Sequence, residues 1–426
     1  MRSKNIYLKN IYYYLPGLFF CIYFIIMSSF NNPEGRVFTL ADDVMISMSY
    51  AKTLVNSGEL VWYEGGPRVQ GFTNLLYTIA LSLIHLLKFD LTTNSLIVSS
   101  LNLFVIFIIS LKVTSISLVV SSGNEKLSYF LGGLIPFQYP LVFWSLRGFE
   151  VGVITLIAIL IVDLLIKSTL KNSKVSQDTL LKIFFLLCIG ILIRIDFIVI
   201  FVSVSLYLLI FNTSNMEDFF NLIKLNLSGV ATLSGLCLFQ YFYYGDFLPN
   251  TYYLKTDGFY LIEKIPRGLL SSFNLLPLLI FIFYLFFNNF KNKQNLRIIS
   301  PIFLVTILLT LYNIYIGGDA WEVYGFANRF ITPIIPLIFA SIPFFLDSAT
   351  FKNNKFLNVT LCIFLFASVF LIQLNVNQLL FFEEPNLKVQ YHEFIYLSIL
   401  LIILIFIKNK VLTTYLIAVL FTVFLS

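Results

Sequence analysis

Two adjacent carboxylates, Asp42 and Asp43, are the residues of this chain best suited to chemistry. They follow a first apolar segment, and a carboxylate close to lipid is costly unless it has a role. One aspartate could simply cap a helix, but two neighbours on a helix point about 100° apart. We therefore expect at least one of them to act as a general base, accepting a proton from a hydroxyl group.

The acidic pair begins a stretch with helical periodicity. Its apolar positions recur every three or four residues, which predicts one apolar stripe; these positions are Val44, Met48, Ala51 and Val55. Asn56, Ser57 and Gly58 then form a stop signal. The pattern predicts a short amphipathic helix that lies on a membrane surface, with the two carboxylates at its N-terminus.

Two short charged turns separate other apolar segments. Glu150 closes the turn 147–150, and Arg194 lies two residues before Asp196. Charges next to a membrane are often functional, but a local arginine–carboxylate pair that joins two helix ends explains them equally well. The sequence leaves both interpretations open.

Two further cations lie in polar segments. Lys255 follows an aromatic turn that contains Asn250, and Arg329 follows the Gly317-Gly318-Asp319 turn. A guanidinium group binds a phosphate through two parallel hydrogen bonds. The alternatives are that Lys255 extends to the membrane interface and that Arg329 forms a salt bridge with Asp319.

Other chemistries have little support. The chain has no Walker loop, no dinucleotide-binding glycine pattern and only two histidines, so we expect neither nucleotide hydrolysis nor a zinc site, and no nucleic-acid partner. The four cysteines lie in apolar segments without paired spacing, which indicates packing rather than disulfides; they are Cys21, Cys188, Cys237 and Cys362.

The composition predicts that membrane helices position these charged residues. The chain is 58% hydrophobic and 12% charged, with a mean hydropathy of +0.88, whereas soluble domains carry about 25% charge. Continuous apolar runs favour helices over strands. We expect an all-α polytopic membrane protein with one integral domain, residues 1–426, and thirteen spans: 11–30, 96–120, 127–146, 151–166, 180–193, 197–211, 222–241, 269–287, 298–316, 331–346, 356–374, 394–407 and 411–425.

The lysine distribution decides how a fourteenth run, 75–87, is interpreted. If this run does not cross the membrane, the lysine-rich loops all face the cytoplasm, as the positive-inside rule requires. The first extracytoplasmic loop is then 31–74, and it carries the acidic pair. The other outward segments are 147–150, 194–196, 244–267, 317–329 and 375–393.

The motifs resemble those of bacterial GT-C-fold glycosyltransferases, in particular the group of the mycobacterial terminal arabinofuranosyltransferase. The resemblance rests on DDVMISMSYAKTLVNSGELVW and the RVQGFTNLLY that follows it, and on four later stretches that agree in order. Those stretches contain Trp144 to Glu150, Ile193 to Asp196, Tyr244 to Lys255 and Gly318 to Pro336. Ser49 and Gln70 depart from the family pattern, which usually has Arg and Glu there.

The resemblance implies a GT-C-like fold and an inverting membrane transferase. Its donor would be a polyprenyl-phosphate-linked sugar, and its acceptor a glycan or glycolipid such as lipopolysaccharide O antigen or a cell-wall polysaccharide, at the outer face of the bacterial inner membrane. Asp42 or Asp43 would be the base, and Lys255, Arg329 and Arg194 would bind the donor phosphate. Further substrate contacts would come from Glu150, Asp196, Asn250, Asp319, Tyr50 and Arg68.

No cofactor is expected, since the outward segments show no dense carboxylate cage for a divalent metal. The alternative from another class is a flippase or transporter for lipid-linked glycans without transferase chemistry. Transporters place ionisable residues in mid-helix, often in related halves. Here the isolated charges cluster in outward segments, which favours the transferase.

Overall fold

The computed structural model describes residues 10–33, 35–38, 40–121, 125–171, 174–250, 261–272, 275–319 and 328–346. The first half contains η1 (Ile11–Tyr13), α2 (Leu15–Met27), β1 (Ser29–Asn32), β2 (Gly35–Phe38), α3 (Asp42–Ser57), α4 (Leu75–His85), α5 (Leu91–Val120), α6 (Glu125–Gly133), η2 (Ile135–Phe137), α7 (Tyr139–Leu146), α8 (Val151–Lys171) and α9 (Gln177–Ile193). The second half contains η3 (Ile195–Phe197), α10 (Ile198–Phe211), α11 (Met216–Tyr244), α13 (Leu261–Ser272), α14 (Leu276–Asn288), α15 (Lys293–Ile316) and α16 (Ile334–Leu346).

Long apolar helices identify the chain as a membrane protein. Within the described residues, four helices are long and apolar enough to cross a bilayer: α5, α8, α11 and α15. At 1.5 Å per residue, about 20 residues cross a ~30 Å hydrocarbon core. The other apolar helices are shorter, so the predicted thirteen spans are not established; the last three, 356–374, 394–407 and 411–425, lie outside the described residues.

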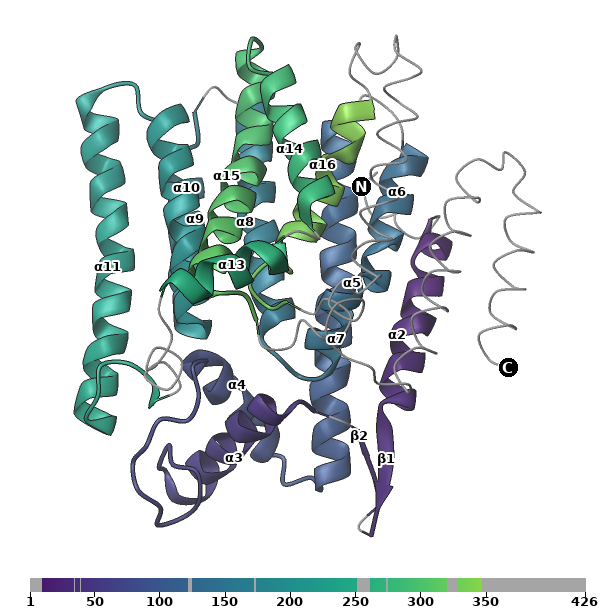
Figure 1. Cartoon of the computed structure of the whole chain (residues 1–426), viewed down its shortest axis with the longest axis vertical. Helices are drawn as coiled ribbons and strands as arrows, with labels where there is room; N and C mark the ends of the chain where they lie inside the picture. The colour runs from purple at the N-terminus through teal and green to yellow at the C-terminus, as the bar shows by residue number, and fades with distance from the viewer. Residues whose placement is uncertain are drawn as a thin grey trace.

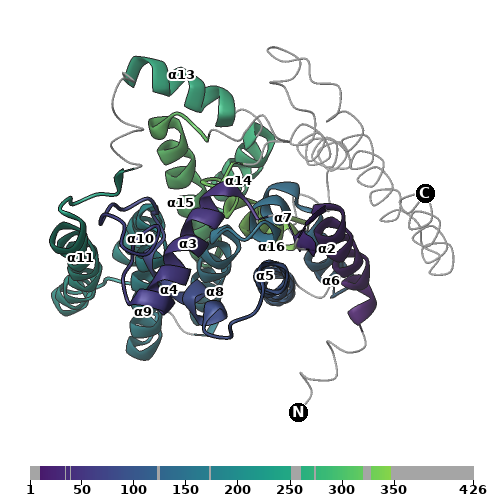
Figure 2. The same ribbon diagram turned by 90° about the horizontal axis from the view of Figure 1, so that it is seen from below.

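The helices form a bundle with two different ends (Figure 1). α3 and α4 lie beneath one end, and the turns that follow α7, α9, α11 and α15 face toward that end. The loops α10–α11 and α14–α15 lie at the other. In the second view, α5 and α8 lie between α2 and α6 on one side and α9, α10 and α11 on the other (Figure 2). The predicted outward segments that the structure describes therefore gather at the α3 end.

The predicted amphipathic helix is present as α3. Val44, Met48 and Ala51 are buried, and Val55 is half-buried, because this stripe packs against α4. The helix ends at Gly58, whose φ of 75° is left-handed, as the stop signal predicts. α4 has only 11 residues, too few to cross a bilayer alone, consistent with the interpretation of 75–87 as a segment that does not span.

One departure from the all-α prediction is a small antiparallel hairpin. The first apolar run forms a helix only as far as Met27, and its last residues enter β1, in which Ser29 pairs with Phe38 and Asn32 with Gly35. Gly35 has a φ of 127°, a conformation that glycine adopts readily. Gly35 can therefore begin β2 directly opposite Asn32, the last residue of β1. The hairpin is tied to α5, since the Phe38 amide donates to the Ser95 hydroxyl at 3.2 Å.

The predicted span 127–146 was wrong as a single helix. It is divided into α6, η2 and α7, because Pro136 and Pro140 lack the amide hydrogens that a continuous helix needs. Gly132, near the end of α6, allows α6 to pack closely on α5, since a Cβ there would lie 2.8 Å from the Ser110 carbonyl of α5. The run 269–287 is also divided: α13 ends at Ser272 and α14 begins at Leu276, with a proline in its first turn.

Candidate functional site at the α3 end of the bundle

The centre of the α3 end is Arg329, which binds two carboxylates at once. Its Nε and Nη2 donate to the two oxygens of Asp319 at 3.0 and 3.1 Å. Its Nη1 donates to Oδ2 of Asp43 at 2.8 Å. The predicted Arg329–Asp319 salt bridge is therefore present, and an unpredicted contact with Asp43 joins α3 to the segment before α16.

Two consecutive glycines position Asp319. α15 ends at Gly317, and both Gly317 and Gly318 have left-handed φ angles, of 86° and 80°. The chain therefore turns sharply, and Asp319 is buried against Arg329. Asn328 is held by Asn313 of α15, whose Oδ1 accepts from the Asn328 side chain at 2.7 Å.

Burial and charge act against each other in this ion pair. Burial by itself raises the pKa of the Asp319 carboxyl, but the adjacent Arg329 guanidinium outweighs burial, and the pKa lies below its ordinary value. Burial by itself lowers the pKa of Arg329, but Asp319 and Asp43 raise it above its ordinary value. The guanidinium also lies over the Trp144 and Phe149 rings, 5.1 and 5.2 Å from their centroids.

A second arginine forms a parallel set of contacts. Arg194, just after α9, binds Oε1 of Glu150 at 3.1 Å and Oδ1 of Asp196 at 2.9 Å. The other Glu150 oxygen accepts from the Asn74 amide at 2.9 Å. Glu150 is 2% exposed, and each of its oxygens accepts from a protein donor, so its contacts are those of a residue that positions Arg194.

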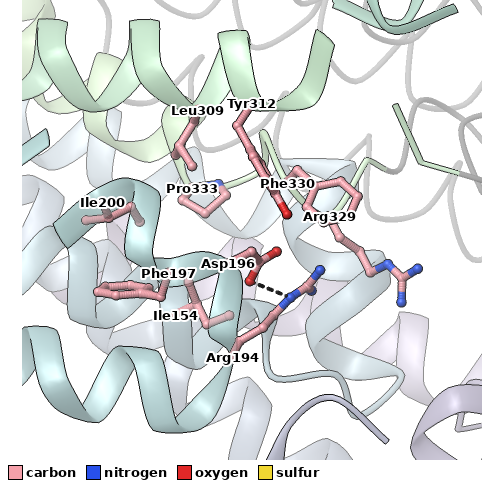
Figure 3. A pocket seen from close by; sticks show the side chains of 10 residues that line it. All are labelled: Ile154, Arg194, Asp196, Phe197, Ile200, Leu309, Tyr312, Arg329, Phe330 and Pro333. Atoms are coloured by element: carbon pink, nitrogen blue, oxygen red, sulfur yellow. Dashed lines mark ion pairs between the residues drawn. The ribbon is translucent and has the colours of Figure 1, made fainter. Parts of the chain in front are cut away.

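The two arginines line one pocket with Asp196 (Figure 3). The remaining wall is mostly apolar, and the empty space totals about 310 Å³, including the part open to solvent. The lining residues come from α8, the α9–α10 turn, the first turn of α10, α15 and the segment before α16; they are Ile154, Arg194, Asp196, Phe197, Ile200, Leu309, Tyr312, Arg329, Phe330 and Pro333. The pocket thus combines cationic groups with an apolar surface.

The two predicted bases differ in their surroundings. Neither serves as the N-cap of α3, which is Ala41. The Asp43 side chain is 49% exposed and is held by Arg329. Asp42 is also exposed, but within the described part of the chain its Oδ1 accepts only from the backbone amide of Asp43, at 2.9 Å. Asp43 therefore faces the charged centre, and Asp42 does not.

Three predicted substrate residues lie outside this centre. Tyr50 is buried, and its hydroxyl donates to the Val69 carbonyl at 2.5 Å and accepts from the Gly71 amide at 3.1 Å. Burial raises the pKa of Tyr50, and the Gly71 amide offsets part of that increase. Tyr50 thus holds the loop between α3 and α4 in place.

Arg68 is an exposed residue of the same loop. It pairs with Glu59 at 3.1 Å and lies 4.8 Å from the centroid of the Tyr243 ring. The backbone amide of Asn250 donates to the backbone carbonyl of Gln70 at 3.2 Å. This bond places Asn250, in the same polar segment as the predicted cation Lys255, against the α3–α4 loop. Lys255 itself lies outside the described residues.

Asn74 is a residue of the centre that the sequence did not reveal. Its Oδ1 accepts from the hydroxyls of Ser47 in α3 and Thr78 in α4, at 3.0 and 2.9 Å, while its amide nitrogen holds Glu150. Asn74 lies directly before α4, and its side chain makes no capping hydrogen bond to that helix. It is the polar residue that joins α3 and α4 to Arg194.

Within the described ranges, no group of three or more histidine, cysteine, aspartate or glutamate side chains is arranged to hold a metal ion. Comparison with protein-family models, with curated proteins and with solved structures finds no match to this chain.

Proposed function

We propose that this protein is a membrane glycosyltransferase of the GT-C type that uses a polyprenyl-phosphate-linked sugar. The observation that carries the proposal is the contact between Asp43, an accessible carboxylate on an amphipathic helix, and Arg329, a cation able to bind phosphate. A base for the acceptor and a cation for the leaving group are thus within reach of one substrate.

The proposed reaction needs few groups. A carboxylate accepts the proton of the acceptor hydroxyl, and the hydroxyl oxygen forms a bond to the anomeric carbon. The bond between that carbon and the phosphate oxygen breaks, and its electron pair leaves with the polyprenyl phosphate. A single displacement inverts the anomeric carbon, and Arg329 stabilises the charge on the departing phosphate.

Donor binding requires an exchange of partners at Arg329. Its Nε and Nη2 are held by buried Asp319, whereas Nη1 faces the half-exposed Asp43. A donor phosphate therefore reaches Arg329 by replacing Asp43. Because Nη1 of Arg329 holds Oδ2 of Asp43 in the structure, this exchange releases the Asp43 carboxylate toward the acceptor hydroxyl when the donor is present.

The charge balance supports such an exchange. The ion pairs of the centre contain four carboxylates, Glu150, Asp196, Asp43 and Asp319, and two guanidinium groups, Arg194 and Arg329. An anionic donor would be repelled if every carboxylate kept its place. Release of Asp43 removes one negative charge from Arg329, and Lys255 is proposed to add a cation.

The donor's apolar chain has a surface beside this centre. α13 lies across the bundle (Figure 1), with Leu261, Ile262 and Leu269 of its outer face more than half exposed. Arg267 of the same helix donates to the Asp319 carbonyl at 2.9 Å. We propose that the polyprenyl chain lies along α13 at the outer face of the inner membrane.

The direct test is transfer of label. Membranes that contain the protein are incubated with a panel of radiolabelled polyprenyl-phosphate sugars and a glycan acceptor. The proposal predicts that one donor loses its label to the glycan and releases polyprenyl phosphate. Translocation of an intact donor without transfer would favour the flippase instead, and no change in any donor of the panel would count against both.

A further inference from the structure

A second charged cluster lies between α5 and α8, outside the pocket of the candidate site. Asp163 of α8 is 6% exposed in its side chain, although it lies in the middle of an apolar helix. Lys112 of α5 binds its Oδ2 at 3.4 Å, and Lys167, one turn further along α8, lies 2.7 and 2.8 Å from its Oδ1 and Oδ2. The cluster belongs to neither the pocket nor the proposed reaction.

The cluster carries an excess positive charge in an apolar setting. Two ammonium groups meet one carboxylate, so one positive charge remains uncompensated by these three residues. A charge inside a bilayer is costly unless it has a counter-ion or reaches the interface. The Lys112 and Lys167 side chains are 34% and 42% exposed, so both side chains lie partly at the surface of the bundle.

The geometry of the cluster suits a single phosphate. Both lysines contact the same carboxylate oxygen, so their ammonium groups are close enough to bind one phosphate together. Lys167 also donates to the Ser115 hydroxyl at 3.0 Å, which fixes its direction toward α5. Lys167 lies one turn before the end of α8 at Lys171, a position from which a lysine side chain reaches the phosphate level of the bilayer.

We propose that Lys112 and Lys167 bind the phosphate of an anionic phospholipid in the leaflet remote from α3. Asp163 holds the two ammonium groups together and competes with the lipid for them. A phosphodiester has one negative charge, which matches the excess charge of the cluster. Basic residues between helices are a recurrent way to bind such head groups.

The test uses the full-length protein in a neutral detergent. Its melting temperature is measured during titration with phosphatidylglycerol, with phosphatidylcholine of the same acyl chains, and with inorganic phosphate. We expect phosphatidylglycerol alone to raise the melting temperature, and native mass spectrometry to retain that lipid on the protein. A rise with inorganic phosphate as well would assign the cluster to free phosphate and overturn the lipid proposal.

Variants with opposite effects sharpen the test. Lys167→Gln should raise the phosphatidylglycerol concentration at half-effect roughly fivefold, and the double variant with Lys112→Gln should raise it about 25-fold. Asp163→Asn should lower that concentration, since it removes the competing carboxylate. If the double variant does not fold, the Lys167→Gln and Asp163→Asn variants still give opposite predicted shifts.

The matched control is Lys174→Gln. Lys174 lies just beyond the same end of α8 and pairs with Asp218 at 2.6 Å, so its loss removes an equal charge from the same end of the bundle. The control should leave the lipid titration unchanged. The proposal is wrong if wild-type protein responds equally to both lipids, or if Lys167→Gln and Lys174→Gln shift the titration equally.

Discussion

Arg329 and Asp43 are 286 residues apart in the sequence, and Nη1 of the arginine lies 2.8 Å from Oδ2 of the carboxylate. The contact joins the surface helix α3 to the segment that follows α15. One side of the guanidinium is fixed by buried Asp319, and the other is fixed by a carboxylate that is half exposed. Arg329 therefore has one buried partner, Asp319, and one half-exposed partner, Asp43, and we propose that a donor phosphate replaces only the second.

The first prediction concerns the shape of the Arg329 side chain. Arg329→Lys keeps the charge but cannot bind both Asp319 oxygens and Asp43 together. We expect a higher apparent KM for the lipid donor and a lower kcat, together with a lower melting temperature. Arg68→Lys, at an exposed ion pair, is the control and should leave all three unchanged. Unchanged donor kinetics in folded Arg329→Lys protein would remove Arg329 from the donor site.

The second prediction separates positioning from substrate binding at Glu150. Glu150→Gln weakens the contact with buried Arg194 but leaves an oxygen for Asn74. Loss of one charge from a buried pair is expected to cost about 3–5 kcal/mol of the free energy of unfolding. Because both Glu150 oxygens already have protein donors, the donor KM should stay near the wild-type value. A large rise in KM without a loss of melting temperature would instead make Glu150 a substrate ligand.

The third prediction concerns Gly148, in the turn before α8. Its φ is 89°, and a Cβ there would lie 2.9 Å from Val44 and 3.0 Å from Val98. Gly148→Ala should lower stability by more than the about 1–3 kcal/mol expected for backbone strain. The matched control is Gly65→Ala, where φ is 74° and no atom lies within 4 Å of the added carbon. If the two variants lost equal amounts of melting temperature, the contact with Val44 of α3 would add nothing to the cost of the backbone strain.

The fourth prediction is a pH dependence that arises from Asp319. Arg329 holds the pKa of this carboxyl below its ordinary value of about 3.9. The folded protein therefore binds fewer protons there than the unfolded chain, and the stabilisation is present above pH 4 and lost as the pH falls further. The melting temperature of wild-type protein should fall more steeply below pH 4 than that of Asp319→Asn. Parallel slopes would contradict this assignment.

Local sequence patterns predicted local structure well in this chain. The apolar stripe of α3 and its end at Gly58 follow from residue spacing, and the lysine distribution predicted which turns share an end of the bundle. The divided segment 127–146 was missed because its overall hydropathy suits a span. Hydropathy does not report that Pro136 and Pro140 lack the amide hydrogens of a continuous helix, nor that Gly132 lies close to α5.

The sequence predicted the residues of the candidate site and some of its contacts, such as the Arg329–Asp319 salt bridge, but not the contacts that join distant segments. Asp43, Arg329, Arg194, Glu150, Asp196 and Asp319 do come together, because charges in an apolar bundle pair with each other. The choice of partners depends on tertiary structure, so the Arg329–Asp43 pair and the role of Asn74 were not foreseen. Tyr50 and Arg68 belong to the same motif as Asp43 but lie outside the charged centre. Tyr50 holds the loop beside it, and Arg68 forms an exposed ion pair with Glu59.

The most direct test of the account compares Asp43→Asn with Asp42→Asn in steady-state transfer from the lipid donor, at matched expression. We expect Asp43→Asn to lower kcat about 10²–10⁴-fold. The donor KM should stay equal or fall, because the side chain that competes for Arg329 has lost its charge. Asp42→Asn, with no ion pair to Arg329, should retain most of the wild-type kcat. If Asp43→Asn kept near-normal turnover, or if Asp42→Asn alone abolished it, Asp43 would not be the base that donor binding releases.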